Sequence, residues 1–346
     1  MTKARKGNFQ ESWKGTALFP RGPKNSITDV AGVKASHLTI QKDFEDGPGR
    51  PASVRTGLTA VLPYAMEKEM RLFAGCFVLN ERGELTGYEV LDDFCYLNSP
   101  IVITNGFNVG VVYNAIFSSG LALKRVEIWP PVVIGIDDSY LSDMTSYVFS
   151  EEEVLRALGI ASDPPLEEGS VGIGLGLRAL GWKGGIGSSS RLLSLAGKQF
   201  ALGALIASNH GNGGSEKERG SLTIIIGVDV PVLPHQIKRI AQGLASSIPS
   251  VLRPDFEDTV TCLMFSTANP MSMEQLLNAE HYGPPAFDYQ MIDDSFLGQI
   301  MAAGREAVAE AILNSLIKAA RVQGKCGRIV RTIPDSEWTK LKPQVS

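Results

Sequence analysis

Short apolar runs rich in β-branched residues recur along the chain and constrain its fold more than any other feature. Several are apolar at every position instead of alternating with polar residues, the pattern of a strand covered on both faces. Eight segments are predicted to be strands: 33–40, 58–62, 73–79, 101–104, 132–136, 200–207, 222–228 and 259–265. A sheet covered on both faces needs a neighbouring layer on each side, so the chain is expected to fold in layers.

The predicted helices are fewer and have clear signals. One covers residues 109–123, and a shorter one covers 151–158. A third begins with Pro234, a residue favoured in the first helical turn, and its apolar side chains fall on one face. Five residues form that face: Ile237, Ile240, Ala241, Leu244 and Ile248.

The last predicted helix is long. It begins near Asp293, Asp294 or Ser295, any of which can cap the free amides, runs to about Val322 and is ended by Gly324. The grouped strands and the absence of an internal repeat favour an α/β fold in which two central sheets lie between helical layers. We expect one αββα domain over residues 1–346.

Composition excludes several function classes. The 346 residues include 33 Lys and Arg against 37 Asp and Glu, and no basic run is interleaved with aromatic residues. Nucleic acid is therefore not expected as a partner. The first fifteen residues lack the apolar core of a signal peptide, and no window has the roughly 18 consecutive apolar residues of a membrane helix. We expect a cytoplasmic protein with no membrane partner.

Metal and disulfide chemistry are not expected either. The four cysteines are scattered, without CxxC or Cys/His spacing, and the four histidines lie far apart with no HExxH motif. We predict reduced structural thiols and no metal or other cofactor.

The bond between Gly220 and Ser221 has unusual chemical potential. A polar stretch at 209–220, NHGNGGSEKERG, joins two apolar strands as a hairpin loop would. Glycine tolerates strained backbone angles, and the hydroxyl of Ser221 can reach the carbonyl before it. After an N-to-O acyl shift and hydrolysis, the new α-amine, with a reference pKa of about 7.7 to 8.0, can serve as base for its own hydroxyl. A Gly-Ser pair is also common in ordinary turns.

Three further segments offer groups for such chemistry. Asn209 ends a buried strand, where its amide could donate to an oxyanion or simply cap a turn. Tyr140, in IDDSYLSD, offers a hydroxyl or a packing ring. KGGIGSSSR, which begins at Lys183, combines a cation, glycines and hydroxyls, but its lysine lies at the wrong end for a phosphate loop.

These pieces occur in one order with others. The chain reads NSITDVAGVKASH from residue 25, then RTGLTAVLP, GELTGYE and PIVITNGFNVGVVYNAI. After the Tyr140 loop follow KGGIGSSSR, LIASNHGNGG, GSLTIIIGVDVPVLPHQIKRIAQ and FSTAN. The set resembles the DmpA-like or P1-type aminopeptidases, which include the β-peptidyl aminopeptidases and the L-aminopeptidase/D-esterases. The shared order is far more specific than any single motif.

The resemblance implies a self-cleaving precursor with an α chain ending at Gly220 and a β chain beginning at Ser221. The two chains would stay folded together as an αββα sandwich and form a homo-oligomer, commonly a tetramer of αβ units. Ser221 matches the nucleophile, Asn209 the oxyanion asparagine and Tyr140 the active-site tyrosine. Lys183 matches a lysine given a site role in related nylon-oligomer hydrolases.

The chain departs from the family pattern at the expected substrate pocket. Relatives usually read PVVGE before the tyrosine, with a glutamate suited to a substrate's amino group, whereas this chain has Gly135 at that position. Gly135 and Asn105, the latter in PIVITNGFNVG, are the positions expected to contact substrate. The stretch between Asn209 and Ser221 also looks shorter than in typical members.

A second departure precedes FSTAN. The family often has a hydroxyl or acid there and an acid two residues later, which together position the new serine amine. This chain has Asp258 and Val260, so Asp258 is expected to orient the amine and the second acid is missing, unless Glu257 or Asp255 replaces it.

The sequence thus predicts an N-terminal-nucleophile aminopeptidase or amidohydrolase that acts on small peptides, amino-acid amides or esters through an acyl-enzyme at Ser221. Two alternatives stay open. Loss of the acid at Gly135 favours substrates without a free amino terminus, such as lactam-like oligomers, since an ammonium bound there would lack a counter-charge. Loss of the family's acids at both Gly135 and Val260 is compatible with a weakly active or inactive scaffold protein.

Overall fold

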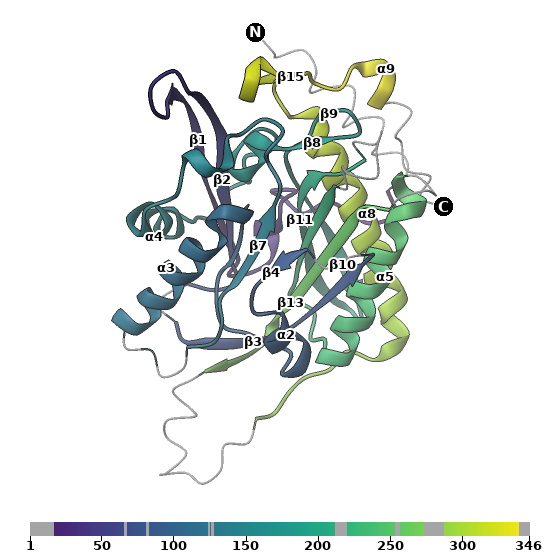
Figure 1. Cartoon of the computed structure of the whole chain (residues 1–346). Helices are drawn as coiled ribbons and strands as arrows, with labels where there is room; N and C mark the ends of the chain where they lie inside the picture. The colour runs from purple at the N-terminus through teal and green to yellow at the C-terminus, as the bar shows by residue number, and fades with distance from the viewer. Residues whose placement is uncertain are drawn as a thin grey trace.

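Two β-sheets lie face to face between two layers of helices in the computed structural model (Figure 1). The structure describes residues 17–65, 68–80, 83–123, 125, 128–211, 220–252, 257–272 and 287–338. No helix among these residues is long and apolar enough to span a membrane. The layer order confirms the αββα architecture expected from the sequence.

The first sheet has five strands in the order β1–β2–β6–β7–β4. Its members are β1 (Lys34–Glu45), β2 (Pro51–Leu62), β6 (Ile101–Asn105), β7 (Val132–Ile136) and β4 (Glu84–Leu85). Only β6 and β7 run parallel. Helices α3 (Val109–Ala122) and α4 (Glu151–Gly159) cover its outer face. Ser150 caps α4 in a reciprocal arrangement with Glu153, which explains where that helix begins.

The second sheet has six strands in the order β10–β11–β12–β13–β3–β5. They are β10 (Ile186–Leu195), β11 (Lys198–Asn209), β12 (Ser221–Val228), β13 (Thr259–Ser272), β3 (Met70–Leu79) and β5 (Tyr96–Leu97). Among its pairs only β12 and β13 run parallel. Helices α5 (Pro234–Leu252) and α8 (Leu297–Ile317) cover its outer face.

Shorter elements close the ends of the sandwich. They are α2 (Tyr88–Asp93), β8 (Arg178–Ala179), β9 (Trp182–Lys183), β14 (Val322–Gln323), β15 (Ile329–Val330) and α9 (Asp335–Trp338). Six 3-10 turns complete the described structure: η1 (Ile27–Asp29), η2 (Gly106–Asn108), η3 (Met144–Ser146), η4 (Gly172–Gly176), η5 (Asp294–Phe296) and η6 (Lys325–Gly327).

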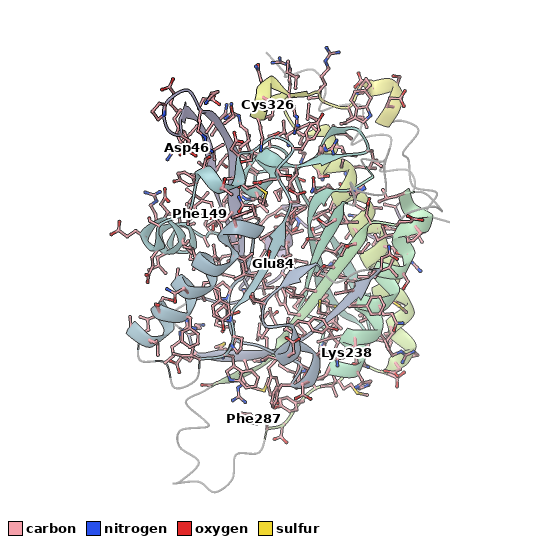
Figure 2. All side chains as sticks on the ribbon, viewed as in Figure 1. Asp46, Glu84, Phe149, Lys238, Phe287 and Cys326 are labelled. Carbon is pink, nitrogen blue, oxygen red and sulfur yellow. The ribbon has the colours of Figure 1, made fainter. Side chains whose placement is uncertain are left out.

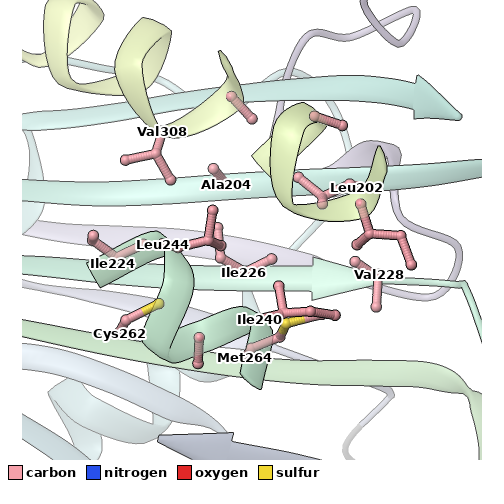
Figure 3. Close-up of a cluster of buried hydrophobic side chains, with 14 of the residues drawn as sticks. Leu202, Ala204, Ile224, Ile226, Val228, Ile240, Leu244, Cys262, Met264 and Val308 are labelled. Carbon is pink, nitrogen blue, oxygen red and sulfur yellow. The ribbon is translucent and has the colours of Figure 1, made fainter. Parts of the chain in front are cut away.

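Three apolar clusters hold the layers together. One lies between the two sheets and one beneath α3 and α4. The third joins the six-stranded sheet to α5 and α8, and Figure 3 shows Ile226 of β12, Ile240 of α5 and Val308 of α8 within it. All five apolar residues predicted on one face of α5 are fully buried there. Strand β12 contributes Ile226 to this cluster and Ile225 to the one between the sheets, so the strand that begins with Ser221 is packed on both faces.

All eight predicted strands are present, most of them longer than expected. The prediction for the last helix was wrong at its end, because α8 stops at Ile317 rather than Val322. Beyond it, the Ser170 hydroxyl donates to the Ala320 carbonyl and accepts from the Ala320 amide, so tertiary bonds replace helical ones. Gly324 lies in a separate turn, against the Leu141 carbonyl.

Candidate active site

Ser221 is the first residue of β12, a central strand of the six-stranded sheet. In the antiparallel pairing with β11 it lies directly opposite Asn209, and in the parallel pairing with β13 it lies beside Thr259. The β11–β12 connection predicted from the sequence is thus an antiparallel one. Residues 212–219 within it lie outside the described residues. The nucleophile and the oxyanion asparagine expected from the sequence are therefore cross-strand neighbours.

Gly220, the residue before Ser221, is held through both its carbonyl and its amide. The Gly220 carbonyl accepts a hydrogen bond from the Thr259 amide at 3.1 Å. The Gly220 amide donates to Asp258 Oδ1 at 2.7 Å, and the Gly211 amide donates to Asp258 Oδ2 at 2.5 Å. Asp258 therefore binds both ends of the β11–β12 connection and lies next to the bond expected to be cut.

The Asn209 side chain is fixed in one orientation. Its Nδ2 donates to the Asp137 carbonyl at 2.7 Å, and its Oδ1 accepts from the Arg178 amide at 3.1 Å. A carbonyl can only accept and an amide N–H can only donate, so these two partners determine which end of the side chain is which. One of the two Nδ2 hydrogens is used by Asp137. The other has no partner among the residues that the structure describes, which leaves it for a ligand.

Tyr140 follows three residues after Asp137 and lies half-buried between two cations. The Arg178 guanidinium lies 3.8 Å from the centroid of its ring, and the Arg328 guanidinium lies 4.8 Å away. Tyr140 also lines a cavity of about 310 Å³. The structure thus places Tyr140, Asn209, Ser221 and Asp258 near one another at one end of the sandwich.

Gly135 is covered by a carboxylate that sequence reasoning missed. Glu84, on edge strand β4, pairs with Gly135 on β7. A Cβ atom placed on Gly135 would lie 2.5 Å from Glu84 Oε2, and one placed on Gly106 would lie 2.9 Å from the same oxygen. A larger residue at either glycine would displace this carboxylate.

Glu84 also lies close to the β12–β13 end of the other sheet. The residue before it, Gly83, approaches Thr259, the parallel partner of Ser221. Figure 2 shows Glu84 near the middle of the molecule. Its side chain is exposed to solvent. The part of it that the protein covers loses hydration, and this raises the pKa of its carboxyl. Its motif, GELTGYE, was part of the family resemblance, but no signal in the sequence distinguished this glutamate from a surface residue.

Lys183 is fully buried on β9. Its Nζ donates to three backbone carbonyls, those of Gly174, Leu177 and Gly184, at 2.6 to 2.7 Å. Removal from water lowers the pKa of Lys183 to about 7. The next residue after Leu177 is Arg178, whose amide holds Asn209, so Lys183 supports the backbone that orients the asparagine.

Asn105 lies at the end of β6 and uses its whole side chain within the protein. Its Oδ1 accepts from the amide and the side chain of Asn108, and its Nδ2 donates to Thr56. A longer contact of 3.4 Å joins Nδ2 to Asp138. Its predicted contact with substrate therefore has no support from this geometry. Asp138 is buried, and loss of hydration raises its pKa to about 7.

From Ile186 onward, KGGIGSSSR forms the first part of strand β10, which was not among the predicted strands. The Ser189 hydroxyl donates to the Ala307 carbonyl of α8 at 2.6 Å. Arg191 is fully buried and forms ion pairs with Glu306 at 3.0 Å and Glu310 at 2.9 Å. Of this motif, Lys183 and the two glycines after it lie beside the backbone that carries Arg178 and Asn209.

The second acid expected beside Asp258 has no counterpart at its own position. Val260 is fully buried in the core beneath α5 and α8. Glu257 is exposed, and Asp255 lies outside the described residues. No group of three or more His, Cys, Asp or Glu suited to a metal ion occurs among the residues that the structure describes.

Comparison with known proteins decides the family. The model of Peptidase family S58 matches residues 25–330. The chain belongs to this family. It is 30% identical to the β-peptidyl aminopeptidase BapA of Sphingosinicella microcystinivorans, over 91% of this chain and 87% of that protein.

Solved structures of S58 peptidases have the same fold. The L-aminopeptidase D-Ala-esterase/amidase of Ochrobactrum anthropi, described as a variant of the Ntn hydrolase fold, matches with a TM-score of 0.81 and 29% identity, over 94% of this chain and 95% of that one. A Burkholderia β-aminopeptidase matches with a TM-score of 0.80 and 29% identity, over 95% and 96%. The protein is thus a serine hydrolase of the N-terminal-nucleophile class, with aminopeptidase or amidase function.

Proposed function

We propose that this S58 peptidase cuts itself between Gly220 and Ser221 and then uses Ser221 to release N-terminal residues from small peptides, amino-acid amides or esters. The observation that carries the proposal is the register of β11 and β12, which sets Asn209 opposite Ser221 while Asp258 and Thr259 bind the amide and the carbonyl of Gly220. Nucleophile, oxyanion donor and scissile bond then share one end of a rigid sheet.

Self-cleavage would proceed by an N-to-O acyl shift. The Ser221 hydroxyl attacks the Gly220 carbonyl carbon, the C–N bond breaks, and the amine takes the hydroxyl's proton. Water then hydrolyses the ester to leave a carboxylate on Gly220 and a free amine and hydroxyl on Ser221. The products would be chains of 220 and 126 residues, since 346 minus 220 is 126. Continuous pairing between β11 and β12 supports their staying together as one folded unit.

Peptide hydrolysis would reuse the same groups. The new α-amine accepts the proton as the Ser221 hydroxyl attacks the substrate carbonyl, then gives it to the leaving amine. The spare Nδ2 hydrogen of Asn209 and the Tyr140 hydroxyl stabilise the oxyanion. The Asp258 carboxylate, already beside the Gly220 amide, orients the new ammonium. Water releases the acyl group.

Glu84 favours substrates with a free amino terminus. Its carboxylate occupies the space above Gly135, where the family pattern led us to expect a glutamate. It makes no hydrogen bond or ion pair within the described part of the chain. A substrate ammonium would supply the missing counter-charge. One relative is named a β-peptidyl aminopeptidase, and an aminopeptidase acts on substrates with a free amino terminus.

The alternative, an amidase for substrates without a free amino terminus, is favoured by Gly135 itself. A panel that pairs each amide with its N-acetylated form separates the two. We expect the wild type to prefer the free amine by about tenfold or more, and Glu84→Gln to lose most of that preference. Equal rates on both forms would favour the alternative. Glu89→Gln, on α2 away from Gly135, is the matched control.

Two wider properties belong to the same proposal. We expect a homo-oligomer, with a tetramer of αβ units as the first state to test by light scattering. We also retain the cytoplasm as the expected location, which cell fractionation can check.

The deciding experiment is intact-mass analysis and N-terminal sequencing of freshly purified protein. We expect a fragment that begins Ser-Leu-Thr-Ile in the wild type, and a single chain of 37.2 kDa in Ser221→Ala. Ser119→Ala, whose hydroxyl bonds within its own helical turn, should be cleaved like the wild type. Cleavage that persists in Ser221→Ala would place the nucleophile elsewhere. A stable wild-type chain would favour the inactive scaffold.

A further inference from the structure

A cavity of about 310 Å³ opens beside Tyr140. Its wall combines the loop after β7 with Arg178 and Trp182 of the β8–β9 hairpin and with Ile329 and Arg331 near β15. Figure 1 shows β8, β9 and β15 together at the top of the view, whereas β4 lies lower in the middle. This volume is near the lower limit of small-molecule pockets, about 300–1,000 Å³. One amino-acid residue would fit.

The cavity shares its wall with the residues that hold Asn209. Arg178 lines the cavity, and its amide donates to Asn209 Oδ1. Asn209 Nδ2 in turn binds the Asp137 carbonyl, near the middle of segment 135–140. Glu84 covers the start of that segment at Gly135, and the cavity lies at its end, at Tyr140. A substrate amide held at Asn209 would therefore have Glu84 toward one end and the cavity toward the other.

The cavity is positively charged. Arg178 and Arg331 line it, and a third cation, Arg328, lies over the ring of the lining residue Tyr140. The Arg331 side chain makes no hydrogen bond or ion pair in the described part of the chain. Two nearby carboxylates have partners already: Asp143 pairs with Lys325 at 3.1 Å, and Asp137 Oδ1 accepts from the Ser139 amide.

Arginine presents a planar fork of hydrogen-bond donors. Among the groups that a peptide substrate offers, a carboxylate fits this fork best, because it can accept two of the hydrogen bonds at once. Beside the cations, Trp182 and Ile329 provide aromatic and apolar surface. Cations next to apolar wall suit an amino acid with a free carboxylate and an uncharged side chain. Cleavage of a dipeptide releases such a molecule as its leaving group.

We propose that this cavity is the leaving-group pocket, and that it selects substrates whose leaving amine belongs to an amino acid with a free carboxylate. The carboxylate binds Arg331 and Arg178, and the side chain of the departing residue packs on Trp182 and Ile329. The inference rests on the proposed function, because it needs the scissile amide at Asn209. It narrows the substrate class from amides in general to dipeptides.

Matched substrates test the proposal in turnover. The processed enzyme is given a dipeptide with C-terminal phenylalanine and the same dipeptide as its C-terminal amide, so that the scissile bond is unchanged. We expect kcat/KM to favour the free acid by about tenfold or more, mainly through KM. Arg331→Gln should bring the ratio near one, and Arg305→Gln, exposed on α8, should keep it. A wild-type ratio near one, or a ratio unaffected by Arg331→Gln, would overturn the proposal.

A binding measurement separates this proposal from the proposed function. Calorimetry compares the affinity of the purified protein, cleaved or uncleaved, for phenylalanine and for phenylalaninamide, and needs no turnover. Tighter binding of phenylalanine that is lost in Arg331→Gln would support the pocket even if the enzyme proved inactive. Turnover without any preference, together with equal binding of both ligands, would reject the pocket and leave the Ser221 mechanism standing.

Discussion

Replacement of Asn209 by alanine tests the proposed stabilisation of the oxyanion. Only one Nδ2 hydrogen is free for an oxyanion, because the other is donated to the Asp137 carbonyl. Asn209→Ala therefore removes one donor, while the Tyr140 hydroxyl stays. Loss of one oxyanion donor lowers kcat by about 10² to 10³, or about 2.7 to 4 kcal/mol of transition-state stabilisation.

The same substitution should leave the fold intact. It removes two hydrogen bonds, to Asp137 and from Arg178, each worth about 1 kcal/mol of net stability. A loss of about 2 kcal/mol is well below the stability of an ordinary domain, about 5 to 15 kcal/mol. Thermal unfolding should thus show a lower but still cooperative transition.

The assay must separate hydrolysis from self-cleavage, since both pass through an oxyanion. The cleaved fraction is measured first on a denaturing gel, and kcat is then expressed per mole of cleaved protein. Asn314→Ala is the control, because this buried asparagine bonds the Ser188 carbonyl away from the site. If Asn209→Ala keeps kcat within about threefold of the wild type, the oxyanion role of Asn209 is wrong.

Three other substitutions test other parts of the structure. Arg191→Met leaves buried Glu306 without its cation and Glu310 with Arg21 alone, and should lower the unfolding free energy in urea by about 3 to 5 kcal/mol; a loss no larger than that of exposed Arg305→Met would contradict this. Asp138→Asn should change the pH dependence of stability. Burial raises the pKa of Asp138 to about 7 in the folded state, from the ordinary aspartate value of 3.8, so the wild type loses stability as pH rises through this window. As the pH rises from 5 to 8, the melting temperature of the wild type should fall relative to that of Asp138→Asn. Parallel curves would show that the buried Asp138 carboxyl does not cause the pH dependence. Asp258→Asn leaves one acceptor for two backbone amides and should slow the appearance of the fragment that begins at Ser221 about tenfold or more on a time-course gel; an unchanged time course would exclude Asp258 from holding the precursor.

The strands could be predicted from the sequence because each is a local run of apolar residues. The face of α5 was predictable for the same reason, since a period of 3.6 is visible in one segment. Asn209 and Ser221 were correctly expected at the two ends of one connection. Their facing each other across β11 and β12 follows from an antiparallel hairpin.

Other features depend on partners far away in the chain. Strand β10 is rich in serine and looks polar, but the Ser189 hydroxyl is satisfied by a carbonyl of α8 more than one hundred residues away. Glu84 lies on a strand of two residues, too short to have a pattern, and only its pairing with β7 brings it over Gly135. The end of α8 is set by Ser170, which no helix-stop signal reveals.

The buried ion cluster around Arg191 has a consequence for the proposed self-cleavage. Arg191 and Arg21 precede Ser221 in the chain, whereas their partners Glu306 and Glu310 follow it. Strands β12 and β13, from the second part, are likewise enclosed between β11 and β3 from the first. Neither fragment could complete this centre alone, so assembly would have to precede scission. Fragments expressed separately would each have unpaired buried charges and exposed strand edges. A cleaved molecule would therefore be one whose precursor had folded completely before the cut.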